Sequence, residues 1–75
     1  MDVDKLVRMA NQIAANFEGG SDENKAVASV TDHIKRFWSP LMKKQIIVRW
    51  KERPGDLTPR AAAAIEAIAA QQTGA

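Results

Sequence analysis

The sequence predicts an all-α protein, a small bundle of four short helices. Apolar residues recur at spacings of three and four through the first half of the chain, which is the period of an amphipathic helix. The second half contains Ser39-Pro40 and Thr58-Pro59, which each combine an N-cap residue with a proline suited to the first helical position. Residues 46–48 are the only stretch of the sequence that resembles a β-strand. A chain of 75 residues makes one domain, 1–75.

The first helix is predicted over residues 3–17, with Asp2 as its N-cap. Its inward stripe consists of Val3, Leu6, Val7, Ala10, Ile13, Ala14 and Phe17. The glycine pair Gly19-Gly20 ends the helix, because glycine tolerates the left-handed conformation that follows a helix C-terminus.

The second helix is predicted over residues 22–38, with Ser21 as its N-cap. Its inward stripe consists of Ala26, Val27, Val30, Ile34 and Phe37. The helix breaks at Ser39, because the residue before a proline resists the α conformation.

The third helix, predicted over residues 40–51, has apolar residues on more than one face. Met42, Ile46 and Trp50 share one side, whereas Leu41 and Val48 lie on another. A surface helix normally keeps its apolar residues in one stripe about 100° wide. We therefore expect more apolar surface on this helix than three short neighbours can cover, so that another protein completes the burial.

The fourth helix is predicted over residues 59–70, after a turn at 52–56. Its inward residues are Ala61, Ala64, Ile65 and Ile68. Alanine favours the helix but offers little area to bury. This helix is therefore expected to be the most weakly held of the four.

Composition excludes several classes of function. The chain has no cysteine, so disulfides and Cys-rich zinc sites are excluded, and a net charge of +2 creates no strong field for nucleic acid. No apolar run reaches the roughly 18 residues of a membrane span, and the acidic, periodic N-terminus is unlike a signal peptide. We expect a cytoplasmic protein that does not bind a membrane.

Few residues could carry catalytic chemistry. His33 is the only histidine, and its neighbour Asp32 cannot face it because successive helical residues point in different directions. One imidazole among scattered carboxylates does not form a metal site, and Ser21 and Ser39 are explained as caps. We expect no catalytic residue, no metal and no cofactor.

One alternative is a small helix-turn-helix-like nucleic-acid-binding protein. The second and third helices would form the motif, with Lys43, Lys44, Gln45 and Arg49 contacting bases. The apolar residues interleaved among these side chains disfavour that alternative. A homodimer that uses the surplus apolar surface of the isolated chain is a further possibility.

Two blocks of the sequence resemble a known family. Residues 6–13 (LVRMANQI) and 33–42 (HIKRFWSPLM) are similar to the delta subunit of NAD-dependent, molybdenum-containing formate dehydrogenases. Leu57 and Pro59 extend the resemblance, while segment 48–56 departs from that family's glycine-rich loop. The resemblance implies a cytoplasmic, cofactor-free accessory subunit that docks on the alpha subunit, which holds the molybdenum cofactor, and that stabilises it or helps it mature. Beta and gamma subunits complete such complexes.

A contact surface for the alpha subunit follows from this resemblance. Outward polar residues inside the similar block, such as Arg8 and Gln12, are better explained by a partner than by packing. The predicted partner-binding residues are Arg8, Asn11, Gln12, Arg36, Trp38, Pro40, Met42, Ile46 and Trp50. For Trp38 and Trp50, core packing stays open as the alternative, because tryptophan serves both roles. The expected mechanism is linkage, in which binding to the folded or cofactor-loaded alpha subunit raises the population of that form.

Overall fold

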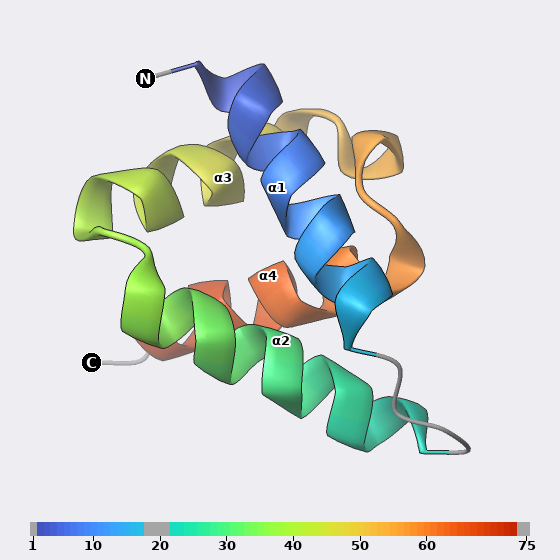
Figure 1. Ribbon diagram of the computed structural model, residues 1–75. Coiled ribbons are helices and arrows are strands. Elements are labelled where there is room, and N and C mark those ends of the chain that lie inside the picture. Colours follow the sequence, from blue (N-terminus) through green and yellow to red (C-terminus); the bar gives the residue numbers. More distant parts are fainter. Residues whose placement is uncertain (1, 18–21, 74–75) are drawn as a thin grey trace.

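A computed structural model describes residues 2–17 and 22–73, and within these ranges the chain forms four α-helices and no strand. The elements are α1 (Val3–Asn16), α2 (Glu23–Phe37), α3 (Pro40–Glu52), the 3-10 turn η1 (Pro54–Asp56) and α4 (Pro59–Thr73) (Figure 1). The predicted all-α class is confirmed. The last helix is longer than predicted, reaching residue 73, and the other helix ends differ from the prediction by no more than one residue.

Local cap chemistry fixes where three of the helices begin. The side chain of Asp2 accepts a hydrogen bond of 3.0 Å from a backbone N–H in the first turn of α1. Ser39 Oγ and Thr58 Oγ1 do the same for α3 and α4, at 3.2 and 3.3 Å. These three caps are confirmed, and they satisfy N–H groups that a helix cannot pair internally.

The N-cap of α2 differs from the prediction. Asp22 occupies that position, with its side chain accepting a hydrogen bond of 3.2 Å from the N–H of Lys25. Serine and aspartate cap helices about equally well, so composition alone could not choose between two adjacent candidates. Ser21 itself and the predicted stop at Gly19-Gly20 lie outside the described residues.

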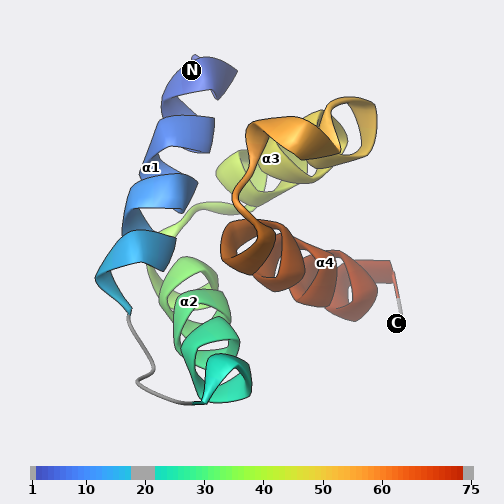
Figure 2. The ribbon, with the colours of Figure 1, turned by 90° about the vertical axis from the view of Figure 1, so that its right-hand side faces the viewer.

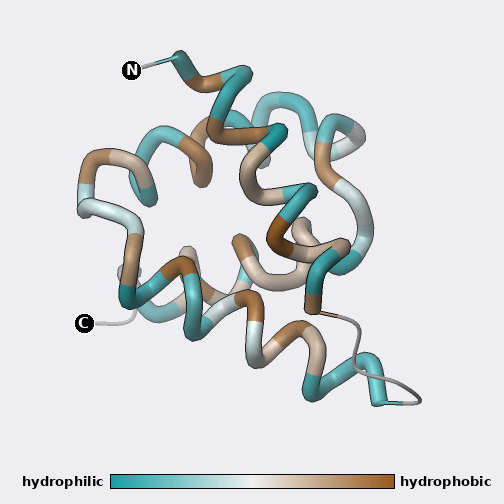
Figure 3. The backbone as a smooth tube through the Cα atoms, in the orientation of Figure 1, coloured by the Kyte–Doolittle hydropathy of each residue, from teal (hydrophilic) through white to brown (hydrophobic). Residues whose placement is uncertain are grey.

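Helix α4 is the most buried helix of the fold, contrary to the expectation that it is the most weakly held. It packs along α2 and also contacts α1 and α3 (Figures 1 and 2). Small side chains let neighbouring helices approach closely, so alanine-rich α4 fits among all three. The core consists of Leu6, Ala10, Ala14, Val30, Ile34, Trp38, Ile46, Ile47, Leu57, Ala61, Ala64, Ile65, Ile68 and Ala69. Figure 3 shows polar and apolar residues alternating along α1 and α2, as one-sided burial requires.

Phe37 and Trp38, at the corner between α2 and α3, differ in exposure: Phe37 contradicts the prediction, while Trp38 takes the core packing that was left open as an alternative. Phe37, expected in the inward stripe, is 70% exposed, whereas Trp38 is only 5% exposed. Phe37 is the last residue of α2, and Trp38 has extended backbone angles (φ −90°, ψ 140°). Helical periodicity therefore stops applying at Trp38, and the extended backbone there changes the direction of its side chain.

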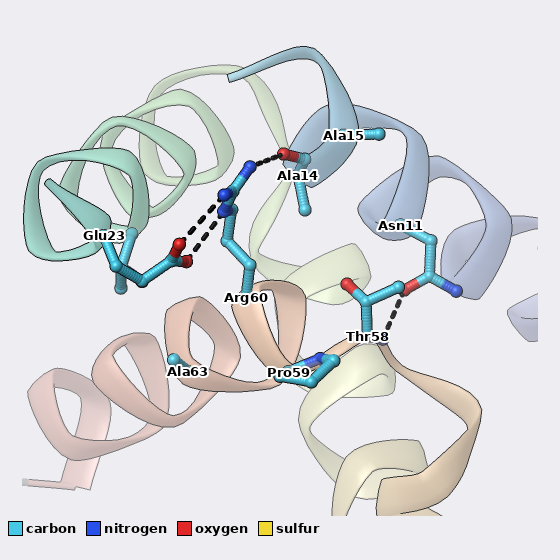
Figure 4. Close-up of a pocket in the computed structure, with 9 residues that line it drawn as sticks. Asn11, Ala14, Ala15, Glu23, Thr58, Pro59, Arg60 and Ala63 are labelled. Carbon is cyan, nitrogen blue, oxygen red and sulfur yellow. Dashed lines mark hydrogen bonds and ion pairs between the residues drawn. The ribbon is translucent and has the colours of Figure 1, made fainter. Parts of the chain in front are cut away.

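One arginine joins three helices. Arg60 of α4 donates to the carbonyl oxygens of Ala14 and Phe17 at the end of α1, at 3.0 and 3.1 Å. It also forms a two-pronged ion pair with Glu23 of α2, at 2.7 and 2.9 Å (Figure 4). The hydrogen bond from Arg60 outweighs desolvation and, together with the charge of Arg60, lowers the pKa of Glu23 below its usual 4.5. This contact joins the end of α1 to the start of α2.

Candidate functional site

An open groove of about 360 Å³ lies where α1 meets the corner between α2 and α3. Its lining residues are Met9, Gln12, Ile13, Asn16, His33, Phe37, Trp38 and Met42. Most of these side chains are apolar or aromatic, and they come from three different helices. We call this feature the corner groove.

Aromatic rings form one side of the corner groove. The ring of His33 lies between Phe17 and Phe37, with centroid separations of 5.7 and 4.8 Å. Phe37 is largely exposed, while Trp38 is buried. An exposed phenylalanine beside half-buried apolar side chains is typical of a protein contact site, because burying an aromatic ring supplies much of the energy of an interface.

The polar side-chain groups of the groove are the amides of Gln12 and Asn16, the imidazole of His33 and the indole N–H of Trp38. Gln12 and Asn16 are exposed on α1, and none of the described lining residues is Asp, Glu, Lys or Arg. An amide both donates and accepts hydrogen bonds, so it can pair with the backbone of a bound chain. The arrangement suits an apolar protein segment rather than an ion.

The predicted partner residues fall into different environments. Gln12, Trp38 and Met42 come together in the corner groove. Arg8 and Pro40 are exposed but do not line it, and Arg36 is exposed and paired with Asp32 at 3.1 Å. Trp50 is half-buried and packs against the core.

Three of the predicted contact residues serve the chain's own structure. Ile46 is fully buried and Trp38 nearly so, because both are enclosed by neighbouring helices. While this fold is kept, Ile46 offers no surface to a partner and Trp38 offers only its small exposed part, which borders the groove. Asn11 Nδ2 donates to the carbonyl of Asp56 at 3.1 Å, and Asn11 Oδ1 accepts from the N–H of Thr58 at 2.9 Å. Its amide fastens the loop between α3 and α4 to α1.

Helix α3 does expose apolar surface, but on a different face from the one expected. Leu41 and Val48 are 58% and 49% exposed. The face of Met42, Ile46 and Trp50 is turned toward the core. The surplus that the sequence indicated is therefore present at Leu41 and Val48.

The basic residues of α3 are poorly placed to contact bases. Lys43 Nζ donates to the carbonyl of Lys35 at 2.9 Å, and Arg49 is bound by the carboxylates of Asp4 and Asp56. Gln45 is half-buried. The helix-turn-helix alternative would require Lys43 and Arg49 to leave their present partners.

Neither a metal cluster nor a membrane span is found in the part of the chain that is described. Over residues 2–17 and 22–73, no group of three or more His, Asp or Glu side chains is placed to hold a metal ion. In the same residues, no helix combines the length and the apolar character needed to cross a bilayer.

Sequence reasoning missed five residues of the groove, namely Met9, Ile13, Asn16, His33 and Phe37. A signal was available, because every lining residue except Asn16 lies in one of the two similar blocks, 6–13 and 33–42. Sequence blocks that meet in space around a groove are more informative than outward polarity alone.

Comparison with known proteins identifies the family. The model of the family described as NADH-dependent formate dehydrogenase delta subunit FdsD matches residues 5–65, a range that contains all the groove residues. Searches of curated proteins and of solved structures gave no match. The match covers most of the chain and confirms the resemblance carried by the two blocks. The chain belongs to the NADH-dependent formate dehydrogenase delta subunit family.

Proposed function

We propose that this chain is a cytoplasmic, non-catalytic subunit that docks on the molybdenum-containing alpha subunit of formate dehydrogenase and stabilises it or helps it mature. One observation carries the proposal. The two sequence blocks that resemble the family line a single open groove with an exposed phenylalanine at its edge. Family membership supplies the identity of the complex.

Burial of Phe37 is the main expected source of binding energy. Its side chain is 70% exposed, and full burial of a phenylalanine side chain contributes about 1.5–3 kcal/mol. Met42 and Ile13 are half-buried beside it and would lose their remaining solvent contact in the same step. An apolar side chain of the alpha subunit would pack among these three side chains.

Polar contacts would fix the orientation of the docked partner. Gln12 is placed to hydrogen-bond the partner's backbone, because its exposed amide borders the apolar part of the groove. Arg8, Arg36 and Pro40 are exposed nearby in sequence and form the proposed periphery. The exposed part of Trp50 belongs to the same proposed periphery.

The proposed mechanism is thermodynamic linkage and involves no chemical step. A subunit that binds the folded or cofactor-loaded alpha subunit, and no other form, stabilises that form by RT ln(1 + [L]/Kd). At a free concentration 100 times the Kd, this amounts to about 2.7 kcal/mol. Beta and gamma subunits would complete the complex.

Deletion and substitution in the native complex test the proposal. Formate dehydrogenase is purified from cells that carry the chain, lack it, or carry Phe37→Ser, and molybdenum per alpha subunit is measured. We expect lower molybdenum content or faster thermal inactivation without the chain, and an intermediate loss with Phe37→Ser. Lys35→Ser, an exposed change on the same helix, is the matched control and should behave as wild type. Unchanged molybdenum content and unchanged stability after deletion would refute the proposal.

A further inference from the structure

A second exposed apolar surface lies on α3, apart from the corner groove. Leu41 and Val48 are about half exposed and border an open hollow of about 480 Å³. The hollow is lined by Val3, Leu41, Lys44, Gln45, Val48, Arg49 and Glu52. It shares no lining residue with the corner groove.

The spacing on this surface is that of a helix-pairing seam. Leu41, Gln45, Val48 and Glu52 follow one another at intervals of four, three and four residues. Such intervals place side chains along one narrow face, as in the contact line of a coiled coil. Leucine and valine occupy alternate positions, with a polar residue after each. We call these four residues the α3 seam.

An unsatisfied polar atom lies within the α3 seam. Gln45 Oε1 is buried and accepts no hydrogen bond from the described residues. Buried polar atoms in folded proteins are nearly always paired. In paired helices a single amide in the seam selects its partner by hydrogen bonding across the interface. This oxygen is covered by the chain itself, but Gln45 as a whole is only half-buried, so the accessible part of its side chain can still meet a facing helix.

Charge on the seam's flanks distinguishes a second copy from another protein. Lys44 and Lys51 follow one flank, and Arg49 lies on the other. If two copies paired antiparallel, Lys44 would face Lys51 of the other copy. If they paired parallel, Lys44 would face Arg49. The antiparallel arrangement opposes exposed like charges, which disfavours association. In the parallel one the repulsion is weaker, because Asp4 and Asp56 already offset the charge of Arg49.

We propose that the α3 seam binds an amphipathic helix of the formate dehydrogenase complex, one whose apolar residues are flanked by Asp and Glu. This inference rests on the proposed function and adds a second contact to it. The acidic flank would face Lys44 and Lys51, which are both exposed. A seam on a helix of only 13 residues binds weakly alone. Linked to docking at the corner groove, it adds affinity because the second contact forms within one complex.

Binding of purified variants to formate dehydrogenase that lacks this chain tests the seam. Lys44→Glu/Lys51→Glu and Leu41→Ser/Val48→Ser should each weaken binding roughly tenfold, the usual effect of losing a central contact. Lys25→Glu/Lys35→Glu changes net charge equally on exposed positions of α2 and should stay within about twofold of wild type. Circular dichroism verifies that each variant remains helical.

The outcomes separate the seam from the corner groove. Equal losses of affinity in Lys44→Glu/Lys51→Glu and Lys25→Glu/Lys35→Glu would overturn the proposed role of the α3 seam, because binding would then depend only on net charge. Wild-type affinity for both seam variants, with Phe37→Ser weakened, would overturn the seam while leaving the groove intact. A wild-type chain that sediments as a dimer, and that Leu41→Ser/Val48→Ser converts to monomer, would assign the seam to a second copy. Failure of the wild-type chain to bind the enzyme would overturn the docking role and the seam together.

Discussion

Replacing Asn11 by alanine should destabilise the chain without touching the groove. The amide of Asn11 makes two hydrogen bonds to the backbone of the loop before α4, at Asp56 and Thr58. These bonds connect residues more than 40 positions apart in sequence. They hold the start of α4 against α1, and no other described side chain makes both contacts.

The expected loss is about 2 kcal/mol. Each hydrogen bond contributes about 1 kcal/mol, the middle of the usual range, because Asn11 is half-buried while both of its bonding partners are exposed. In a domain of this size, 1 kcal/mol lowers Tm by about 4–8 °C, so Asn11→Ala should lower Tm by roughly 8–16 °C. Asn11→Asp keeps the acceptor for Thr58 but loses the donor to Asp56, so at least half of the loss should remain.

Thermal unfolding followed by circular dichroism measures this effect. Gln12→Ala is the matched control, since it alters the adjacent exposed amide and should change stability by less than about 0.5 kcal/mol. A Tm for Asn11→Ala within 3 °C or so of wild type would refute the structural role assigned to this residue. Asn11 would then return to the set of partner contacts predicted from the sequence.

Three further changes probe the packing. Arg60→Gln should cost about 2 kcal/mol in urea unfolding, because it removes charged hydrogen bonds to two α1 carbonyl groups; an unchanged midpoint would contradict the contact. The lowered pKa of Glu23 means that its contribution to stability is complete above the usual value of 4.5 and is lost as pH falls through the lowered pKa. Glu23→Gln should therefore flatten this part of an acid unfolding curve, and an identical curve would disprove the linkage. Ala64→Leu should cost about 1–3 kcal/mol by overpacking the α4 interface, whereas Ala15→Leu on the exposed side of α1 should be tolerated.

The sequence predicted best the features governed by local chemistry. Asp2, Ser39 and Thr58 cap their helices as expected, because an N-cap depends on a few neighbouring backbone groups. The all-α class follows from the same local signals together with the spacing of apolar residues. These features need no knowledge of how the helices pack.

Prediction failed where packing or a helix end decides the outcome. Periodicity assigned Phe37 to the core, but the helix stops there and the extended Trp38 fills the core instead. The small side chains of α4 offer little area to bury and suggested that this helix is loosely held. Its alanines instead allow it to approach three helices closely. Both errors come from treating each helix as an isolated cylinder.

The candidate site was predicted only in part for the same reason. Outward polarity on α1 singled out Gln12, which does border the groove. The set of predicted partner residues also included Asn11, which instead bonds to a loop distant in sequence. Long-range hydrogen bonds of this kind leave no trace in helical spacing. Met42 was expected on a shared face and lies partly buried in the groove, while the exposed apolar surface of α3 is at Leu41 and Val48.

Titration of the purified chain against the formate dehydrogenase alpha subunit tests the central claim most directly. Phe37 is the exposed anchor of the groove. Because most of its side chain is exposed in the isolated chain, Phe37→Ser should leave Tm unchanged. We predict saturable binding by the wild-type chain and roughly tenfold weaker binding by Phe37→Ser. The Lys35→Ser variant should bind with the same affinity as the wild-type chain. Equal affinity of the wild-type chain and Phe37→Ser, or no binding by either, would contradict the claim that the corner groove is the docking site.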